Sequence, residues 1–219
     1  MRLRAMLCQS VLILFLLGGS ACSPLASVLR PNDPRLSEIL QISKIRSIQL
    51  RNGWDGLSPF APTEAHYSLQ PGATAFSGQA NFSIGGNFDI KEPITETQNI
   101  EIPLKNIQAF LDKLAACPFS EGEYQPSIEW TDDYPSLKIE IELQTGSITF
   151  YSSSQGTSHV PWAMYYNDKT YVVDSSAPMA ALAELDPYLE TDRLNALINQ
   201  AQNSLSHQPT SVPVPTSTP

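Results

Sequence analysis

The chain has 219 residues, of which 42% are hydrophobic and 16% are charged, so it is long enough for one globular domain but not for a second complete one. Its 13 basic and 22 acidic residues give a net charge of −9, and no cluster of Lys or Arg offsets that charge locally. Such a surface repels phosphate backbones, which argues against nucleic acid as a partner.

The first segment has the parts of an export signal in the correct order. Arg2 and Arg4 give a positive start, residues 6–17 form an apolar run, and residues 18–21 are small. The apolar run is shorter than the roughly 20 residues that span a bilayer, so we expect a signal peptide, residues 1–21, rather than a transmembrane helix. Removal of the signal peptide lowers the number of basic residues from 13 to 11, while the 22 acidic residues remain, so the net charge becomes −11.

The signal ends in Gly19-Ser20-Ala21-Cys22, which resembles the lipobox of bacterial lipoproteins. That resemblance implies cleavage after Ala21, a lipid on Cys22, and attachment of the exported domain to a cell-envelope membrane. Ser23 after the cysteine implies the outer membrane in a diderm organism, with the domain facing the periplasm or the exterior. Gly19 stands where the family has an aliphatic residue, so ordinary signal-peptidase cleavage of the same bond is the alternative.

Residues 22–44 are predicted to be a lipidated tether, because the Pro- and Ser-rich sequence after Cys22 has no sustained hydrophobic period. An α+β domain is predicted over residues 45–205. Its first strands, in which apolar and polar residues alternate, are expected at residues 45–51, 65–69, 76–84 and 100–102.

A helix is predicted to begin at Pro103, with one apolar stripe formed by Leu104, Ile107, Phe110, Leu111 and Leu114. Hairpins are expected at residues 137–150 and 162–173, followed by two C-terminal helices and a disordered tail, residues 206–219. Alternating strands predict a sheet with one wet face, and the helices follow blocks of strands. We therefore predict an α+β fold, an antiparallel sheet of hairpins packed against one central helix and a C-terminal helix pair.

The sequence contains no motif of a known catalytic, metal or cofactor site. Gly85-Gly86 is not followed by the Lys-Ser/Thr of a phosphate-binding loop, and the nucleophile elbow, zinc and calcium patterns are missing. With Cys8 removed and Cys22 acylated, Cys117 is left without a cysteine partner, and we expect it to be a small buried hydrophobe. We therefore predict no catalytic residue, no metal ion and no cofactor.

Three loops concentrate side chains suited to contacting a ligand or partner. One carries Trp54, a second combines acidic and aromatic residues, and a third is rich in Ser and Thr. Each loop also has a structural alternative. The loop with Trp54 would close one end of the sheet core, the acidic loop would be solvated, and the loop rich in Ser and Thr would be a polar loop without catalytic geometry. If the fold brings the loops together, they predict a contact surface formed by Trp54, Trp130, Asp132, Asp133, His159 and Trp162.

The stretches W-x-G-L-x-P (54–59), T-D-D-Y-P-S (131–136) and H-V-P-W (159–162) resemble uncharacterised exported domains of cyanobacterial and related bacterial lipoproteins. That resemblance implies no activity. We favour a non-enzymatic binding or scaffolding module, held at a membrane by its lipid, with an envelope protein or polymer as partner. The alternatives are a hydrolase of envelope polymers that uses His159 with Asp132 or Asp133, and a domain that inhibits an enzyme with an aromatic loop.

Overall fold

The computed structural model describes residues 34–54, 62–85, 92–123, 136–152, 162–173 and 176–206, the side chains of residues 204–206 excepted. These residues all belong to one unit of the chain, Asn32–Pro219. Within them the predicted α+β class and the antiparallel sheet are confirmed.

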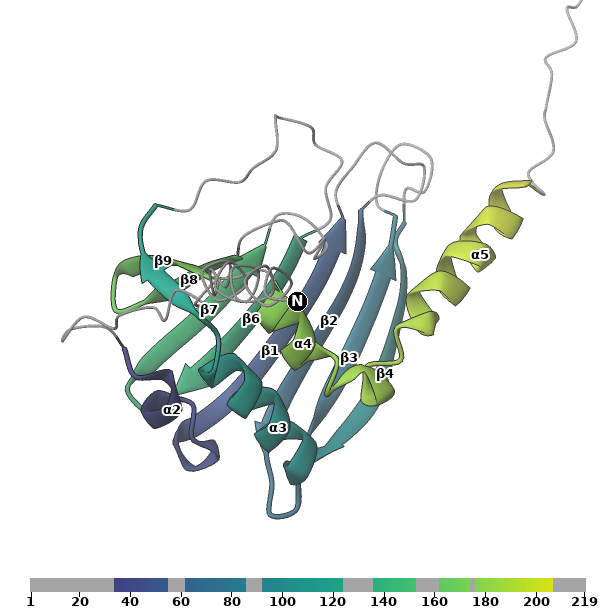
Figure 1. Cartoon of the computed structure of the whole chain (residues 1–219). Helices are drawn as coiled ribbons and strands as arrows, with labels where there is room; N and C mark the ends of the chain where they lie inside the picture. Colours follow the sequence, from purple (N-terminus) through teal and green to yellow (C-terminus); the bar gives the residue numbers. More distant parts are fainter. Residues whose placement is uncertain are drawn as a thin grey trace, which may run out of the picture. The chain divides into compact units, whose positions relative to one another are not determined.

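The described strands form one nine-stranded antiparallel sheet in the order β4-β3-β2-β1-β6-β7-β8-β9-β5 (Figure 1). Strands β1 to β4 and strands β6 to β9 are two successive meanders, joined where β1 pairs with β6. The pairing of Ile48 with Ile141 thus connects segments that are distant in the sequence. The strands are β1 Ile45–Trp54, β2 Thr63–Pro71, β3 Ala75–Ile84, β4 Ile94–Pro103, β5 Phe119–Glu121, β6 Ser136–Leu143, β7 Gly146–Ser152, β8 Trp162–Tyr166 and β9 Lys169–Val173.

The described helices pack against one face of this sheet, and Figure 1 shows α3 and α4 in front of the strands. Their apolar residues and those of the sheet form one buried cluster. The helices are α2 Leu36–Ile39, the 3₁₀ helix η1 Ile42–Lys44, α3 Leu104–Ala115, α4 Ser176–Leu182, the 3₁₀ helix η2 Asp186–Tyr188 and α5 Asp192–Ser206. None of these described helices has both the length and the apolar character that crossing a membrane would require.

The period-two pattern of the strands explains why the sheet has one buried and one wet face. In β3, for example, Phe76, Phe82 and Ile84 are buried, whereas Ser77 and Gln79 are exposed. The buried face meets the apolar stripe of α3, whose members Ile107, Phe110, Leu111 and Leu114 are inaccessible to solvent. Helices therefore close one side of the sheet, and no described helix closes the other.

Two expectations from the sequence are corrected. The tether predicted for residues 22–44 does not extend to residue 44, because α2 and η1 precede β1 and Leu36 and Leu40 are in the core. The short edge strand predicted at residues 100–102 is the ten-residue strand β4. Its first half alternates Thr with Glu and Gln, so unbroken backbone pairing with β3 holds it in the sheet, and apolar alternation gives no signal there.

Candidate functional site

The side of the sheet that no described helix covers carries mostly polar side chains, and we call it the polar face. Its side chains are exposed or half-buried, with Ser47 as the more buried exception, and most are hydroxyls and amides. Two tyrosines and a few charged groups complete it. The polar face consists of Thr95, Thr97, Asn99 and Glu101 on β4; Ser77, Gln79, Asn81 and Ser83 on β3; Glu64, His66, Ser68 and Gln70 on β2; Ser47, Gln49 and Arg51 on β1; Lys138, Glu140 and Glu142 on β6; Thr149 and Tyr151 on β7; and Tyr165 on β8.

Strand register places these side chains in rows across the sheet. One row, from β4 to β8, consists of Asn99, Gln79, Ser68, Gln49, Glu140, Thr149 and Tyr165. Opposite residues of neighbouring antiparallel strands have Cβ atoms about 4.5–5.5 Å apart, so the row is a continuous series of hydrogen-bonding groups. A second row brings His66, Arg51 and Lys138 next to one another.

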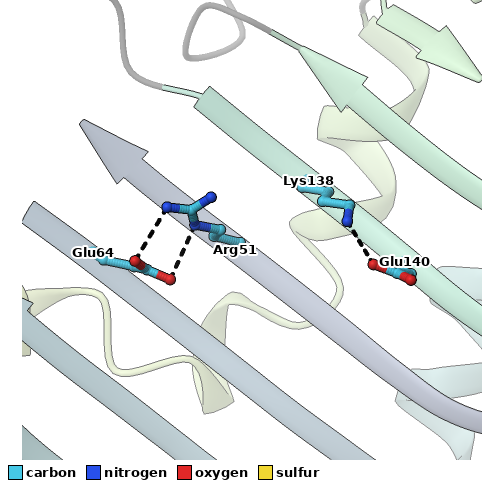
Figure 2. Close-up of polar contacts among 4 residues, drawn as sticks. All are labelled: Arg51, Glu64, Lys138 and Glu140. Carbon is cyan, nitrogen blue, oxygen red and sulfur yellow. Dashed lines mark hydrogen bonds and ion pairs between the residues drawn. The ribbon is translucent and has the colours of Figure 1, made fainter. Parts of the chain in front are cut away.

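Four charged groups at the centre of the polar face form two ion pairs within it, Arg51 with Glu64 and Lys138 with Glu140 (Figure 2). Arg51 lies directly opposite Lys138, a like-charge arrangement that is unfavourable by itself. Figure 2 shows that the two cations turn to different carboxylates. The Arg51 guanidinium donates to both oxygens of Glu64 at 3.0 and 3.2 Å, and the Lys138 Nζ lies 2.6 Å from Glu140 Oε2. The centre of the face therefore offers hydrogen-bonding groups rather than an unpaired charge.

A shallow groove of about 660 Å³ lies over β2, β3 and β4 on this face. Gly78 forms part of it, and a Cβ atom there would lie only 1.7 Å from the Ser68 carbonyl oxygen. The two strands can approach so closely because Gly78 has no side chain. Amide and hydroxyl side chains with a single carboxylate make up most of the lining, which consists of Ser68, Gln70, Ser77, Gly78, Gln79, Asn99, Ile100 and Glu101.

A smaller cavity of about 310 Å³ lies on the opposite, covered side, between β1, β2 and β6 and the segment from α4 to Thr191. Leu50, Leu137 and Leu182 are among its apolar walls. The Tyr67 hydroxyl donates a 2.6 Å hydrogen bond to the Leu189 carbonyl oxygen in this wall. Burial, assisted by the negative charge of Glu190, raises the pKa of Tyr67 to about 12. The phenol is thus a neutral structural donor that fastens the segment after η2 to the sheet.

Of the residues predicted to form a contact surface, Trp54 and Trp162 are described. Trp54 ends β1 and is partly exposed, whereas Trp162 begins β8 and is 0% exposed, so its ring belongs to the core and not to the surface. Its Nε1 has no hydrogen-bond partner among the described residues. Strands β6 and β7 separate β1 from β8, which places the two strands about 14 Å apart at roughly 4.8 Å per step.

The other predicted site residues lie outside the described part of the chain: Cys22, Trp130, Asp132, Asp133 and His159. Cys117 is described; it is buried, as expected, and its Sγ lies 3.4 Å from the Lys113 carbonyl oxygen. The polar face itself was not predicted as a site. The alternation of Ser, Gln and Asn in β3 was a signal for it, but long-range strand pairing, which assembles the rows, cannot be read from a local pattern.

Comparisons with protein-family models, with curated proteins and with solved structures find no match for this chain. Within the described residues, His, Cys, Asp and Glu side chains form no group of three that could hold a metal ion.

Proposed function

We propose that this chain is an exported lipoprotein, anchored to an envelope membrane through Cys22, whose domain is a non-enzymatic binding module with the polar face as its contact surface. The observation that carries the proposal is the uncovered side of a nine-stranded sheet, rich in amides and hydroxyls and with its central charges paired. We further propose that α3 is the central helix of the covered side and that the two C-terminal helices flank it.

The partner that fits this chemistry best is an uncharged, hydroxyl-rich polymer, such as a neutral glycan of the envelope. Side-chain amides both donate and accept hydrogen bonds, as sugar hydroxyls do, and Gln79 and Asn99 are directly opposite each other in the groove. Glu101 and the net charge of −9 disfavour a polyanion. A flat polar surface also suits an extended polymer better than a small apolar molecule, which prefers an enclosed apolar pocket.

The alternatives formed from the sequence remain predictions. A hydrolase would use His159 with Asp132 or Asp133, and these residues lie outside the described part of the chain. An inhibitor-like domain would depend on aromatic loops, and of the two described tryptophans that border such loops, Trp54 is partly exposed and Trp162 is buried. Neither alternative gains support from the geometry of the sheet.

The binding proposal is tested by co-sedimentation of the full mature chain, in detergent, with insoluble neutral envelope glycan. Gln79→Arg places a long cation in the groove, and Asn199→Arg places the same charge at an exposed position of α5, outside the polar face. We expect Gln79→Arg to weaken binding by about tenfold or more, an effect of about 1.4 kcal/mol, while Asn199→Arg binds like the wild type. Equal binding by both variants, or no sedimentation of the wild type, would contradict the proposal.

The anchor is tested separately by mass spectrometry of the mature N-terminus. We expect a peptide that begins at Cys22 and carries a diacylglyceryl mass, and we expect Cys22→Ala to release the protein from the membrane fraction. A mature chain with an unmodified Cys22 thiol would rule out the anchor. That result would leave the glycan-binding test unaffected, because the two readouts concern different parts of the chain.

A further inference from the structure

The two edges of the sheet differ in a way that points to a partner. At one edge β5 has three residues, a length that offers little for another strand to pair with. At the other edge β4 has ten residues, and its pairing with β3 runs without a bulge from Ile94 to Pro103. No described residue pairs with the outer side of β4.

An open edge of this length exposes a row of backbone donors and acceptors that another strand can use. Proteins usually block such an edge with charged side chains, especially lysines, with bulges or with proline within the strand. Strand β4 contains no Lys or Arg and no bulge, and its one proline, Pro103, is its last residue. Its two carboxylates are Glu101 and Glu96, and Glu96 is paired with Arg193 of the same chain. The edge is therefore suited to accept a strand along most of its length.

We propose that β4 is a self-association edge, at which a second copy of this chain pairs antiparallel about a two-fold axis near Gln98. Such an axis must be perpendicular to the sheet, so both polar faces point to the same side. Opposite residues are then Thr95 with Glu101 and Thr97 with Asn99 on the polar face. On the covered side, Ile94 lies opposite Ile102.

Charge is compatible with this register, in which the axis lies at the middle of β4, and disfavours the registers centred on either carboxylate of the strand. An axis at Glu96 or at Glu101 would place identical carboxylates directly opposite, which is destabilising. With the axis near Gln98, each of these carboxylates faces an uncharged side chain. Glu96 is already neutralised within its own copy, because Arg193 donates to its Oε1 from Nε at 2.7 Å and Gln98 donates from Nε2 at 2.8 Å. The covered side near the axis therefore carries little net repulsion.

Pairing of this kind also extends the polar face. Asn99 and Glu101 belong both to β4 and to the groove lining, so two grooves would lie on either side of the axis on one continuous sheet. The proposal does not rest on the glycan, since backbone pairing and register carry it.

The proposal is tested by sedimentation velocity of the full mature chain in detergent. Thr97→Lys introduces two cations close to the axis, and Thr149→Lys introduces the same change in the middle of the sheet. We expect a wild-type dimer, a rise of about tenfold or more in the dissociation constant for Thr97→Lys, and a wild-type constant for Thr149→Lys. A monomeric wild type, or equal dimerisation by both variants, would overturn the proposal.

A second measurement fixes the register. In the double variant Thr97→Cys/Asn99→Cys, the introduced thiols oppose each other across the axis, so oxidation should give a covalent dimer on a non-reducing gel. The double variant Thr95→Cys/Asn99→Cys matches an axis at Thr97 and should cross-link much less. Slow cross-linking of the first pair, in a chain that still dimerises, would show that the copies meet elsewhere and would overturn the proposal.

Discussion

The two faces of the sheet are made by the same strands, yet they differ in what they contribute. On the covered face, alternate residues such as Ile48, Phe76 and Phe150 are inaccessible to solvent and belong to one core shared with the helices. On the polar face, their neighbours in sequence remain in contact with water and make hydrogen bonds and ion pairs of modest value. Burial of apolar area is the main source of stability, so the covered face maintains the fold and the polar face is free to vary for binding.

The sharpest test of this difference uses two adjacent residues of β7. Phe150 is fully buried on the covered face, whereas Thr149 is half-buried on the polar face. We expect Phe150→Ala to lower the free energy of unfolding by about 3–5 kcal/mol, because it removes buried apolar area and leaves a cavity. Thr149→Ala should cost less than about 1 kcal/mol, the range of strand propensity. Urea titration of both variants measures the difference. Equal losses in the free energy of unfolding would mean that the two faces contribute equally to stability.

A second prediction concerns the close approach of β2 and β3. At Gly78 a methyl group would lie 1.7 Å from the Ser68 carbonyl oxygen, whereas at Gly53 its nearest neighbour would be Arg51 Nε at 3.6 Å. Gly78→Ala must push two paired strands apart, at a cost of about 1–3 kcal/mol or more. Gly53→Ala should be neutral or stabilising by up to about 1 kcal/mol, because it restricts the unfolded chain. Thermal unfolding of the two variants compares them, and similar melting temperatures would refute the steric account.

The third prediction concerns Tyr67, the polar group that joins the covered face to the segment after η2. Because the pKa of Tyr67 is raised from 10.0 to about 12, the folded protein holds this proton more tightly than the unfolded chain does. The tighter binding of this proton contributes roughly 2–3 kcal/mol at most to the free energy of unfolding. This contribution is complete below pH 10 and is lost as the pH rises from about 10 to 12. Tyr67→Phe should cost about 1–3 kcal/mol at neutral pH, since it leaves the Leu189 carbonyl oxygen unpaired.

Stability measured by urea titration at several pH values tests that assignment. Between pH 10 and 12 the wild type should lose more stability than Tyr67→Phe, so the difference between them should shrink. A constant difference over this range would contradict the role of the Tyr67 proton.

Much of the fold could be predicted from local patterns, because local chemistry determines it. The alternation in β3 and β6 indicated strands, and the apolar stripe from Leu104 to Leu114 indicated α3. The β8–β9 hairpin was also predicted, and Asn167 and Asp168 there adopt the positive φ angles that a two-residue turn requires.

The remaining features depend on contacts between distant segments. Nothing near Ile48 indicates that β1 pairs with β6, and the three residues of β5 are too few to give a period. The N-terminal half of β4 was missed because its stability comes from β3. For the same reason the site prediction favoured loops with conspicuous aromatic residues over the rows of small polar side chains that register assembles on the polar face.

The smallest predicted effect concerns the ion pairs of the polar face. Arg51 and Lys138 are directly opposite, so each depends on its carboxylate to relieve a like-charge contact. A double-mutant cycle with Arg51→Gln and Glu64→Gln should give a coupling of about 0.2–1 kcal/mol at low salt, since both side chains are partly exposed. That coupling should fall in 1 M salt, where the Debye length is about 3 Å. A coupling that is large and insensitive to salt would mean that these charges are shielded from water, and the polar face would then resemble the covered one.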